Sequence, residues 1–326
     1  MKTHDTINIL CATDNRYAPY CGIMLTSLLE NNKHNAIDIY IFGGQDIRSD
    51  NIKKFKNLEQ LYNCHVNVIA IDDNMLSSCP VNHDTNITLA TYYRLLAPQI
   101  LPISVHKLIY LDCDMIISDD IKPIWDTPLE NKAIAGVIDC EAYNESIYHR
   151  LGDYTQKRDY YNAGMTVYNM DFWRKNDVAG QAFKYIEQNS SNLYWMDQDV
   201  LNVILADKKV LLPIQYNFQT LFYLPRNWKA YSTEYQEQIL KAGLSPVVIH
   251  YNGPGKPWVF RYYGSPYFRE WTKYQQLSQW PNEIVRKPIV KYLKYLIKRY
   301  IVPSFYKKQI ARSWHVEETN KHIYWI

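Results

Sequence analysis

The stretch from Lys107 to Asp114 constrains the fold of this chain more than any other. Leu108 to Leu111 form an apolar run typical of a buried strand, and two carboxylates, Asp112 and Asp114, follow it. In open α/β sheets, ligands bind outside the carboxyl ends of the strands. Side chains two positions apart on a strand point to the same side, so this pair suits a hard cation such as Mn²⁺ or Mg²⁺. The spacing alone also fits a solvated turn.

Segments with strand and helix character alternate through the first half of the chain. Strands are predicted at 7–12, 37–42, 66–71, 108–111 and 133–138, and helices at 19–29, 51–62 and 88–96. This alternation predicts a parallel, doubly wound α/β sheet. Asp14 and Asp139 each follow a predicted strand, as Asp112 does. We therefore expect these carboxylates to open onto the same edge of the sheet.

Three later segments carry further candidate site residues. A strand over 160–169 begins with Asn162, Ala163 and Gly164, which leave space for a ligand near the backbone. Asp197-Gln198-Asp199 begins a helix, where an aspartate also fits a simple cap. His250 directly follows a last predicted strand over 246–249, but a lone histidine at a strand end is more often structural than a ligand. A loop with glycines and a lysine, which can bind phosphate, comes after His250.

Composition places the chain among folded proteins that remain in a reducing compartment. At 326 residues it can form one large domain with an appendage, and 47% hydrophobic residues exclude disorder as the default. The amino terminus lacks the features of a signal peptide, and no apolar run is long enough to span a membrane. The six cysteines show no Cys-x-x-Cys pair, so we expect reduced thiols and a cytoplasmic protein.

The basic charge of the chain is concentrated near its carboxyl end. Nine lysines and arginines and no acidic residue lie between Arg286 and Arg312, although the whole chain has a net charge of only +3. Residues 288–301 have a helical period with an apolar face opposite a row of lysines. An ordinary helix packed on the body fits this pattern, but the aromatic and basic content favours an interfacial helix on an anionic membrane surface, through residues 284–314. No motif supports nucleic-acid binding.

Seven blocks of sequence, taken in order, resemble glycosyltransferase family 8, the bacterial lipopolysaccharide galactosyl- and glucosyltransferases related to glycogenin. The resemblance covers about residues 7 to 262. The blocks are Ala12-Thr13-Asp14 with Tyr17, Thr91 to Leu95, Tyr110 to Asp114, Val137 to Asp139, Tyr161 to Gly164, Asp197 to Asp199, and His250 to Gly253 through Lys256 to Trp258. The resemblance implies a GT-A fold, with a doubly wound mixed sheet of Rossmann-like type over residues 1–265. Residues 266–326 are then a small, helical, basic region for membrane association.

The resemblance also implies a role for each candidate residue. It makes Asp112, Asp114 and His250 ligands of Mn²⁺, or of Mg²⁺ in its place, and it places Asp139, Asp197 and Gln198 around the transferred sugar. The implied donor-binding residues are Ala12, Asp14, Arg94, Asp112, Cys113, Asp114, Asn162, Ala163, Gly253 and Lys256. Among these, we expect the Cys113 side chain to face away from the metal.

The expected activity is retaining transfer of galactose or glucose from UDP-galactose or UDP-glucose to a bacterial surface glycan or glycolipid such as lipopolysaccharide. The resemblance leaves open whether Gln198 is a nucleophile, but an amide is a poor one, so same-face displacement is favoured. The expected location is the inner face of the cell membrane, with the protein bound peripherally. The alternatives are a metal-dependent nucleotidyltransferase, a sugar-nucleotide hydrolase, and a non-catalytic, membrane-associated glycan-binding protein.

Overall fold

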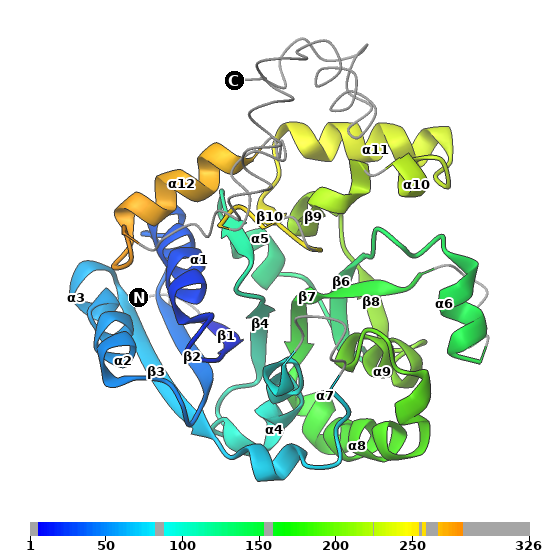
Figure 1. Ribbon diagram of the computed structural model, residues 1–326, viewed down its shortest axis with the longest axis horizontal. Helices are drawn as coiled ribbons and strands as arrows, with labels where there is room; N and C mark the ends of the chain where they lie inside the picture. The colour runs from blue at the N-terminus through cyan, green and yellow to red at the C-terminus, as the bar shows by residue number, and fades with distance from the viewer. Residues whose placement is uncertain are drawn as a thin grey trace, which may run out of the picture.

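The computed structural model describes residues 6–81, 88–152, 159–223, 225–253, 256–258 and 267–282. The strands of its main sheet are β1 (Ile7–Thr13), β2 (Ile37–Gly44), β3 (Cys64–Ile71), β4 (Lys107–Leu111), β6 (Ile134–Ile138), β7 (Tyr161–Asn169) and β8 (Lys209–Leu211). They lie in the order β3-β2-β1-β4-β7-β6-β8 (Figure 1). The predicted α/β class and the mixed sheet implied by the resemblance are therefore confirmed. The wholly parallel sheet that the alternation of strands and helices predicted is wrong, because β7 is antiparallel to its neighbours.

Strand direction decides which chain segments meet at the edge of the main sheet where β1, β4 and β6 end. We call this edge the functional edge. Strands β3, β2, β1 and β4 pair in parallel, and β6 pairs in parallel with β8. Strand β7 is inserted between β4 and β6 and is antiparallel to both. The amino end of β7 therefore lies at the same edge as the carboxyl ends of β1, β4 and β6.

Helices cover both faces of this sheet, as the alternation of apolar residues along β1 requires. Ile7, Ile9 and Cys11 pack on one face with α1, whereas Leu10 and Ala12 pack on the other with α7, α8 and α9 (Figure 1). Proline in the first turn of α1 suits the start of a helix. The α-helices are α1 (Ala18–Asn31), α2 (Ser49–Lys56), α3 (Leu58–Leu61), α4 (Ala97–Ile100), α5 (Lys122–Trp125), α6 (Glu145–Arg150), α7 (Met170–Lys175), α8 (Val178–Asn189), α9 (Asp197–Ile204), α10 (Pro225–Trp228), α11 (Thr233–Leu244) and α12 (Phe268–Leu277).

A second, smaller sheet brings a late segment of the chain to the functional edge. Its strands are β5 (Met115–Ile117), β9 (Phe218–Gln219) and β10 (Val248–His250), in the order β5-β10-β9. Because β5 directly follows the Asp112–Asp114 turn and pairs His250 with Met115, this sheet fixes His250 beside that turn. Pairing in a second sheet is thus what joins two segments that are far apart in sequence.

Strand β4 ends at Leu111, as predicted, but Asp112 and Asp114 lie in a turn after it and not on an extended strand. Two predicted helices also differ from the structure. The helix predicted over 51–62 is divided into α2 and α3 at Asn57, and the one predicted over 88–96 is a 3₁₀ helix. The 3₁₀ helices are η1 (Asp73–Leu76), η2 (Leu89–Leu96), η3 (Ser190–Asn192), η4 (Ile214–Asn217) and η5 (Thr220–Tyr223).

The carboxyl-terminal part of the described chain packs on the sheet domain. Trp271 and Tyr274 of α12 share a cluster with Ile23 of α1, and Trp280 is buried in the core beside Gly22. The helix predicted over 288–301, and with it the basic region, lies outside the described residues. No helix in the ranges described combines the length and the hydropathy that crossing a bilayer would need.

Candidate active site and metal centre

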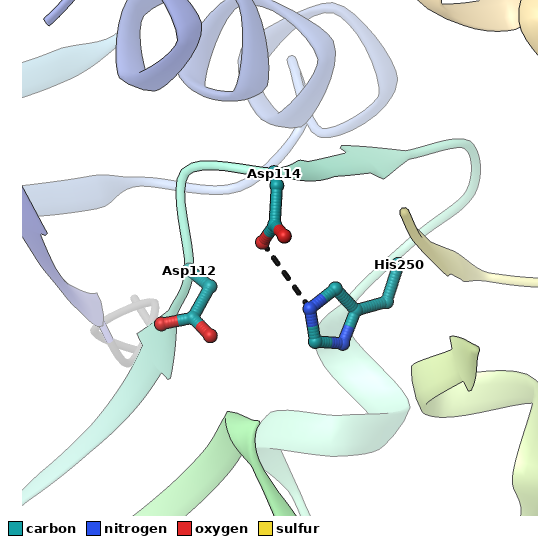
Figure 2. A group of neighbouring side chains, drawn as sticks. All are labelled: Asp112, Asp114 and His250. Carbon is teal, nitrogen blue, oxygen red and sulfur yellow. Dashed lines mark ion pairs between the residues drawn. The ribbon is translucent and has the colours of Figure 1, made fainter. Parts of the chain in front are cut away.

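Asp112, Asp114 and His250 converge at the functional edge of the sheet. One ligand atom from each side chain lies within 4.8 Å of the other two, and His250 Nε2 lies 3.2 Å from Asp114 Oδ1 (Figure 2). The two carboxylates are partly buried and His250 is buried. The predicted convergence of these three side chains is confirmed. Two carboxylates and an imidazole form a donor set that suits a divalent cation such as Mn²⁺.

Gly164 makes room for this cluster. A Cβ atom at position 164 would lie 2.6 Å from His250 Cε1, 2.7 Å from Asp112 Oδ2 and 2.9 Å from Met115 Cε. The backbone of Gly164 also accepts a 2.8 Å hydrogen bond from the Asp112 N–H. Protein side chains, and not a ligand, thus occupy the space beside this glycine. The close packing at Gly164 holds the Asp112 and His250 side chains next to each other, and two carboxylates with an imidazole are donors that fit a divalent cation.

Each aspartate of the pair has its own cationic partner. Arg94 Nη2 donates to Asp112 Oδ1 at 2.8 Å, and the ammonium group of Lys256 contacts Asp114. Although burial by itself raises the pKa of Asp114, the charge of Lys256 and the ring of His250 outweigh it and hold that pKa well below its usual range. The carboxylate is therefore ionised and ready to bind a cation.

Arg94 is buried and binds both Asp112 and Asp197. Its guanidinium lies 3.0 Å from Asp197, donates at 2.5 Å to the backbone carbonyl of Ala163, and stacks 3.8 Å from the Tyr110 ring centroid. Asp197 begins α9, but its side chain binds Arg94 and the Thr91 hydroxyl instead of capping the helix. Burial raises the pKa of Asp197 to about 6, and the nearby Asp112 carboxylate adds to this rise, although Arg94 and the Thr91 hydroxyl act in the opposite direction.

A second group of polar side chains lies beside the metal cluster, at the start of β7. Asn162 Nδ2 donates to Asp139 Oδ2 at 2.9 Å, and Gln198 Nε2 donates to the same oxygen at 3.2 Å. Gln198 Oε1 accepts from the Ala163 N–H at 2.9 Å and from Asn162 Nδ2 at 3.2 Å. The candidates from β6, β7 and α9 thus form one hydrogen-bonded group.

The remaining candidates make other contacts. Cys113 Sγ donates to the backbone carbonyl of Ala12 at 3.1 Å, so its thiol is bonded within the protein. Asp14 accepts from the Tyr17 N–H at 2.7 Å and shapes the loop after β1.

Gly253 has φ +80°, and its Cβ position would meet Leu221. Asp199 differs from Asp197, since Arg150 and the Tyr160 hydroxyl bind its buried carboxylate.

Sequence reasoning missed two residues that touch the candidate site. Asn217, at the end of η4, binds His250, and Thr91, in η2, binds Asp197. Thr91 stands in one of the blocks that resemble the family, three residues before Arg94. That spacing could have indicated that Thr91 lies on the same side of the helix as Arg94. Asn217 stands between aromatic residues in a segment with no predicted element, so no sequence pattern marks it.

Comparisons with known proteins agree with this geometry. The model of glycosyl transferase family 8 matches residues 8–261. The chain is 27% identical to general stress protein A of Bacillus subtilis over 285 residues, which is 86% of this chain and 96% of that protein. It is also 27% identical to lipopolysaccharide 1,2-glucosyltransferase of Escherichia coli K12 over 259 residues, with 79% of this chain and 74% of that protein covered.

Solved structures support the fold. The crystal structure of galactosyltransferase LgtC with donor and acceptor sugar analogs superposes with a TM-score of 0.73 at 22% identity, covering 84% of this chain and 96% of that chain. The fold is therefore GT-A, as the resemblance implied. Because the family model spans most of the chain and its match begins and ends beside the predicted blocks, the chain belongs to glycosyl transferase family 8.

Proposed function

We propose that this glycosyltransferase transfers galactose or glucose from a UDP-sugar to a bacterial surface glycan, with retention of anomeric configuration and with Mn²⁺ or Mg²⁺. The observation that carries the proposal is the convergence of Asp112, Asp114 and His250 beside Gly164. The named activities of relatives such as the Escherichia coli lipopolysaccharide 1,2-glucosyltransferase support the choice of hexose and acceptor.

The proposed roles follow from charge and position. A bound divalent cation would neutralise charge on the departing diphosphate as a Lewis acid. Lys256 would pair with the diphosphate, because its ammonium already lies at the metal cluster. Ala12 and Asp14 would hold the nucleoside at the carboxyl end of β1. Asp139, Asn162 and Gln198 would orient the transferred sugar.

The contacts of Gln198 favour same-face displacement over a covalent intermediate. Its Oε1 already accepts from the Ala163 N–H and from Asn162 Nδ2, and a carbonyl oxygen has two lone pairs. An attacking oxygen would have to leave both donors. We therefore propose that a UDP oxygen takes the acceptor proton, while Gln198 orients the sugar.

A donor and acceptor screen tests the proposed reaction. Incubation with UDP-galactose or UDP-glucose, Mn²⁺ and a lipo-oligosaccharide should give UDP and a longer glycan. Free hexose without glycan extension would indicate a sugar-nucleotide hydrolase, and absence of UDP binding would indicate a glycan-binding protein. Unchanged turnover in EDTA would contradict the metal role.

Substitution of the metal ligands gives a sharper test. Asp112→Asn and Asp114→Asn should each abolish transfer, because each removes a charged oxygen ligand. Asp126→Asn is the matched control, since Asp126 pairs with Lys122 on the surface outside the site. Circular dichroism should show a native fold in all three variants.

We further propose that residues 284–314 bind an anionic membrane surface, where a lipid-linked acceptor is found. Each lysine or arginine near such a surface contributes about 1 kcal/mol. Truncation after Glu283 should abolish sedimentation with vesicles that contain phosphatidylglycerol. Equal sedimentation of the truncated and full chains would contradict the proposal, and neutral phosphatidylcholine vesicles serve as the control.

A further inference from the structure

Asn217 links the metal cluster to the polar group at the start of β7. Its side chain is fully buried, and both of its polar atoms are used. Asn217 Oδ1 lies 3.0 Å from His250 Nδ1, and Asn217 Nδ2 donates to Asn162 Oδ1 at 2.9 Å. Because His250 is a candidate metal ligand, a residue that fixes its ring also influences the metal site.

The direction of these hydrogen bonds is fixed at Asn162 by two groups. The Gly164 backbone N–H can only donate, and it donates to Asn162 Oδ1 at 3.0 Å. The Asp139 carboxylate accepts from Asn162 Nδ2 at 2.9 Å. These contacts orient the Asn162 amide, so its oxygen accepts from Asn217 and the amide oxygen of Asn217 faces His250. Neither amide can be reversed without setting donor against donor or acceptor against acceptor.

The ring of His250 is oriented in turn. Since Asn217 presents an oxygen, the nitrogen that faces it, His250 Nδ1, must carry a hydrogen. The other nitrogen, Nε2, points toward Asp114 (Figure 2). We propose that Asn217 is a positioning residue that holds His250 with Nδ1 protonated and Nε2 directed at the metal. This inference rests on the metal site of the proposed function.

The expected size of the effect follows from metal sites in general. Groups that hydrogen-bond the second nitrogen of a ligating histidine fix its tautomer and orientation, and their loss weakens metal binding by roughly 10- to 100-fold. Leucine has a shape close to that of asparagine but no acceptor. Asn217→Leu should therefore leave the His250 ring without its partner and still fill the space.

Titration of the nucleotide-free protein with Mn²⁺ by calorimetry tests the inference. Asn217→Leu should raise the Kd by about 10- to 100-fold relative to the wild type. Asn32→Leu is the matched control: Asn32 is buried, donates to the Leu28 carbonyl and accepts from the Ile121 N–H, away from the metal cluster. Its Kd should equal that of the wild type. An unchanged Kd in Asn217→Leu would overturn the inference, whereas a wild type that binds no Mn²⁺ would overturn the metal site itself.

A measurement on the wild type keeps the inference testable if Asn217→Leu does not fold. Long-range ¹⁵N–¹H correlation spectra of the metal-free protein report which imidazole nitrogens carry hydrogen. The chain has nine histidines, and the signals that are lost in His250→Gln identify the ring of interest. We expect a protonated Nδ1. A ring with bare Nδ1 and protonated Nε2 would overturn the inference.

Discussion

Gly164→Ala should disable the metal site through a single methyl group. The added Cβ would lie 2.6 Å from His250 Cε1 and 2.7 Å from Asp112 Oδ2, about 0.8 Å and 0.7 Å short of the 3.4 Å at which ordinary contact begins. Side-chain ends often move aside cheaply, but these two are held. Asn217 binds the imidazole, and the buried Arg94 binds the carboxylate.

The strain has two consequences of different kinds. Inserting a methyl group into a filled site typically costs about 1–3 kcal/mol of stability. Bonds from Mg²⁺ to oxygen are about 2.0–2.1 Å long and demand near-ideal geometry, so displacement of two ligands by a large fraction of an ångström breaks the donor set. We expect the Mn²⁺ affinity to fall at least ~10-fold, which corresponds to ~1.4 kcal/mol.

Urea unfolding and Mn²⁺ calorimetry separate these consequences when Gly136→Ala is measured beside Gly164→Ala. A Cβ at Gly136 in β6 would meet Tyr161 Cδ2 at 2.8 Å and Thr166 Cγ2 at 3.3 Å, and neither is a candidate ligand. Both variants should lose stability, but only Gly164→Ala should lose Mn²⁺ affinity. Wild-type Mn²⁺ affinity in Gly164→Ala would refute the reasoning, since the two ligands would then have moved freely.

Two further predictions concern charged groups. Because burial raises the pKa of Asp197 from 3.8 to about 6, the folded protein holds a proton between these pH values that the unfolded chain has released. The proton's contribution to stability is fully present below pH 3.8 and is lost as the pH rises through 6, a fall of about 3 kcal/mol. Urea unfolding of Asp197→Asn should lack this slope, and equal slopes would contradict the burial argument. Lys256→Gln should tighten Mn²⁺ binding to the nucleotide-free protein about tenfold and weaken UDP binding, because the ammonium competes with the cation for Asp114. Calorimetry measures both changes. Lys122→Gln is the control, because Lys122 forms a lysine–carboxylate pair outside the site. An unchanged Mn²⁺ affinity in Lys256→Gln would show that Lys256 does not compete with the cation.

The sequence predicted the convergence at the sheet edge for a general reason. Strand β4 could be read from its apolar run, and parallel neighbours bring their carboxyl ends to one edge. His250 was placed there by the resemblance and not by the pattern, because the pattern does not reveal that β10 pairs with β5 in a second sheet. The 3₁₀ form of η2 was also hidden, since its apolar spacing fits either helix type over so short a segment.

Local sequence could not predict which charged side chains pair with one another in the site. Asp112 and Asp114 are equivalent in the motif, yet Arg94 pairs with the first and Lys256 with the second. Arg94 is buried and shared with Asp197, whereas Lys256 has a long, flexible stem and also donates to the carbonyl of Tyr251. If the proposed UDP-sugar binds, we expect its diphosphate to attract Lys256 away from Asp114 and to leave Arg94 paired with Asp112. The two aspartates should then differ in how easily each is released to the proposed cation, and this difference would arise from long-range packing.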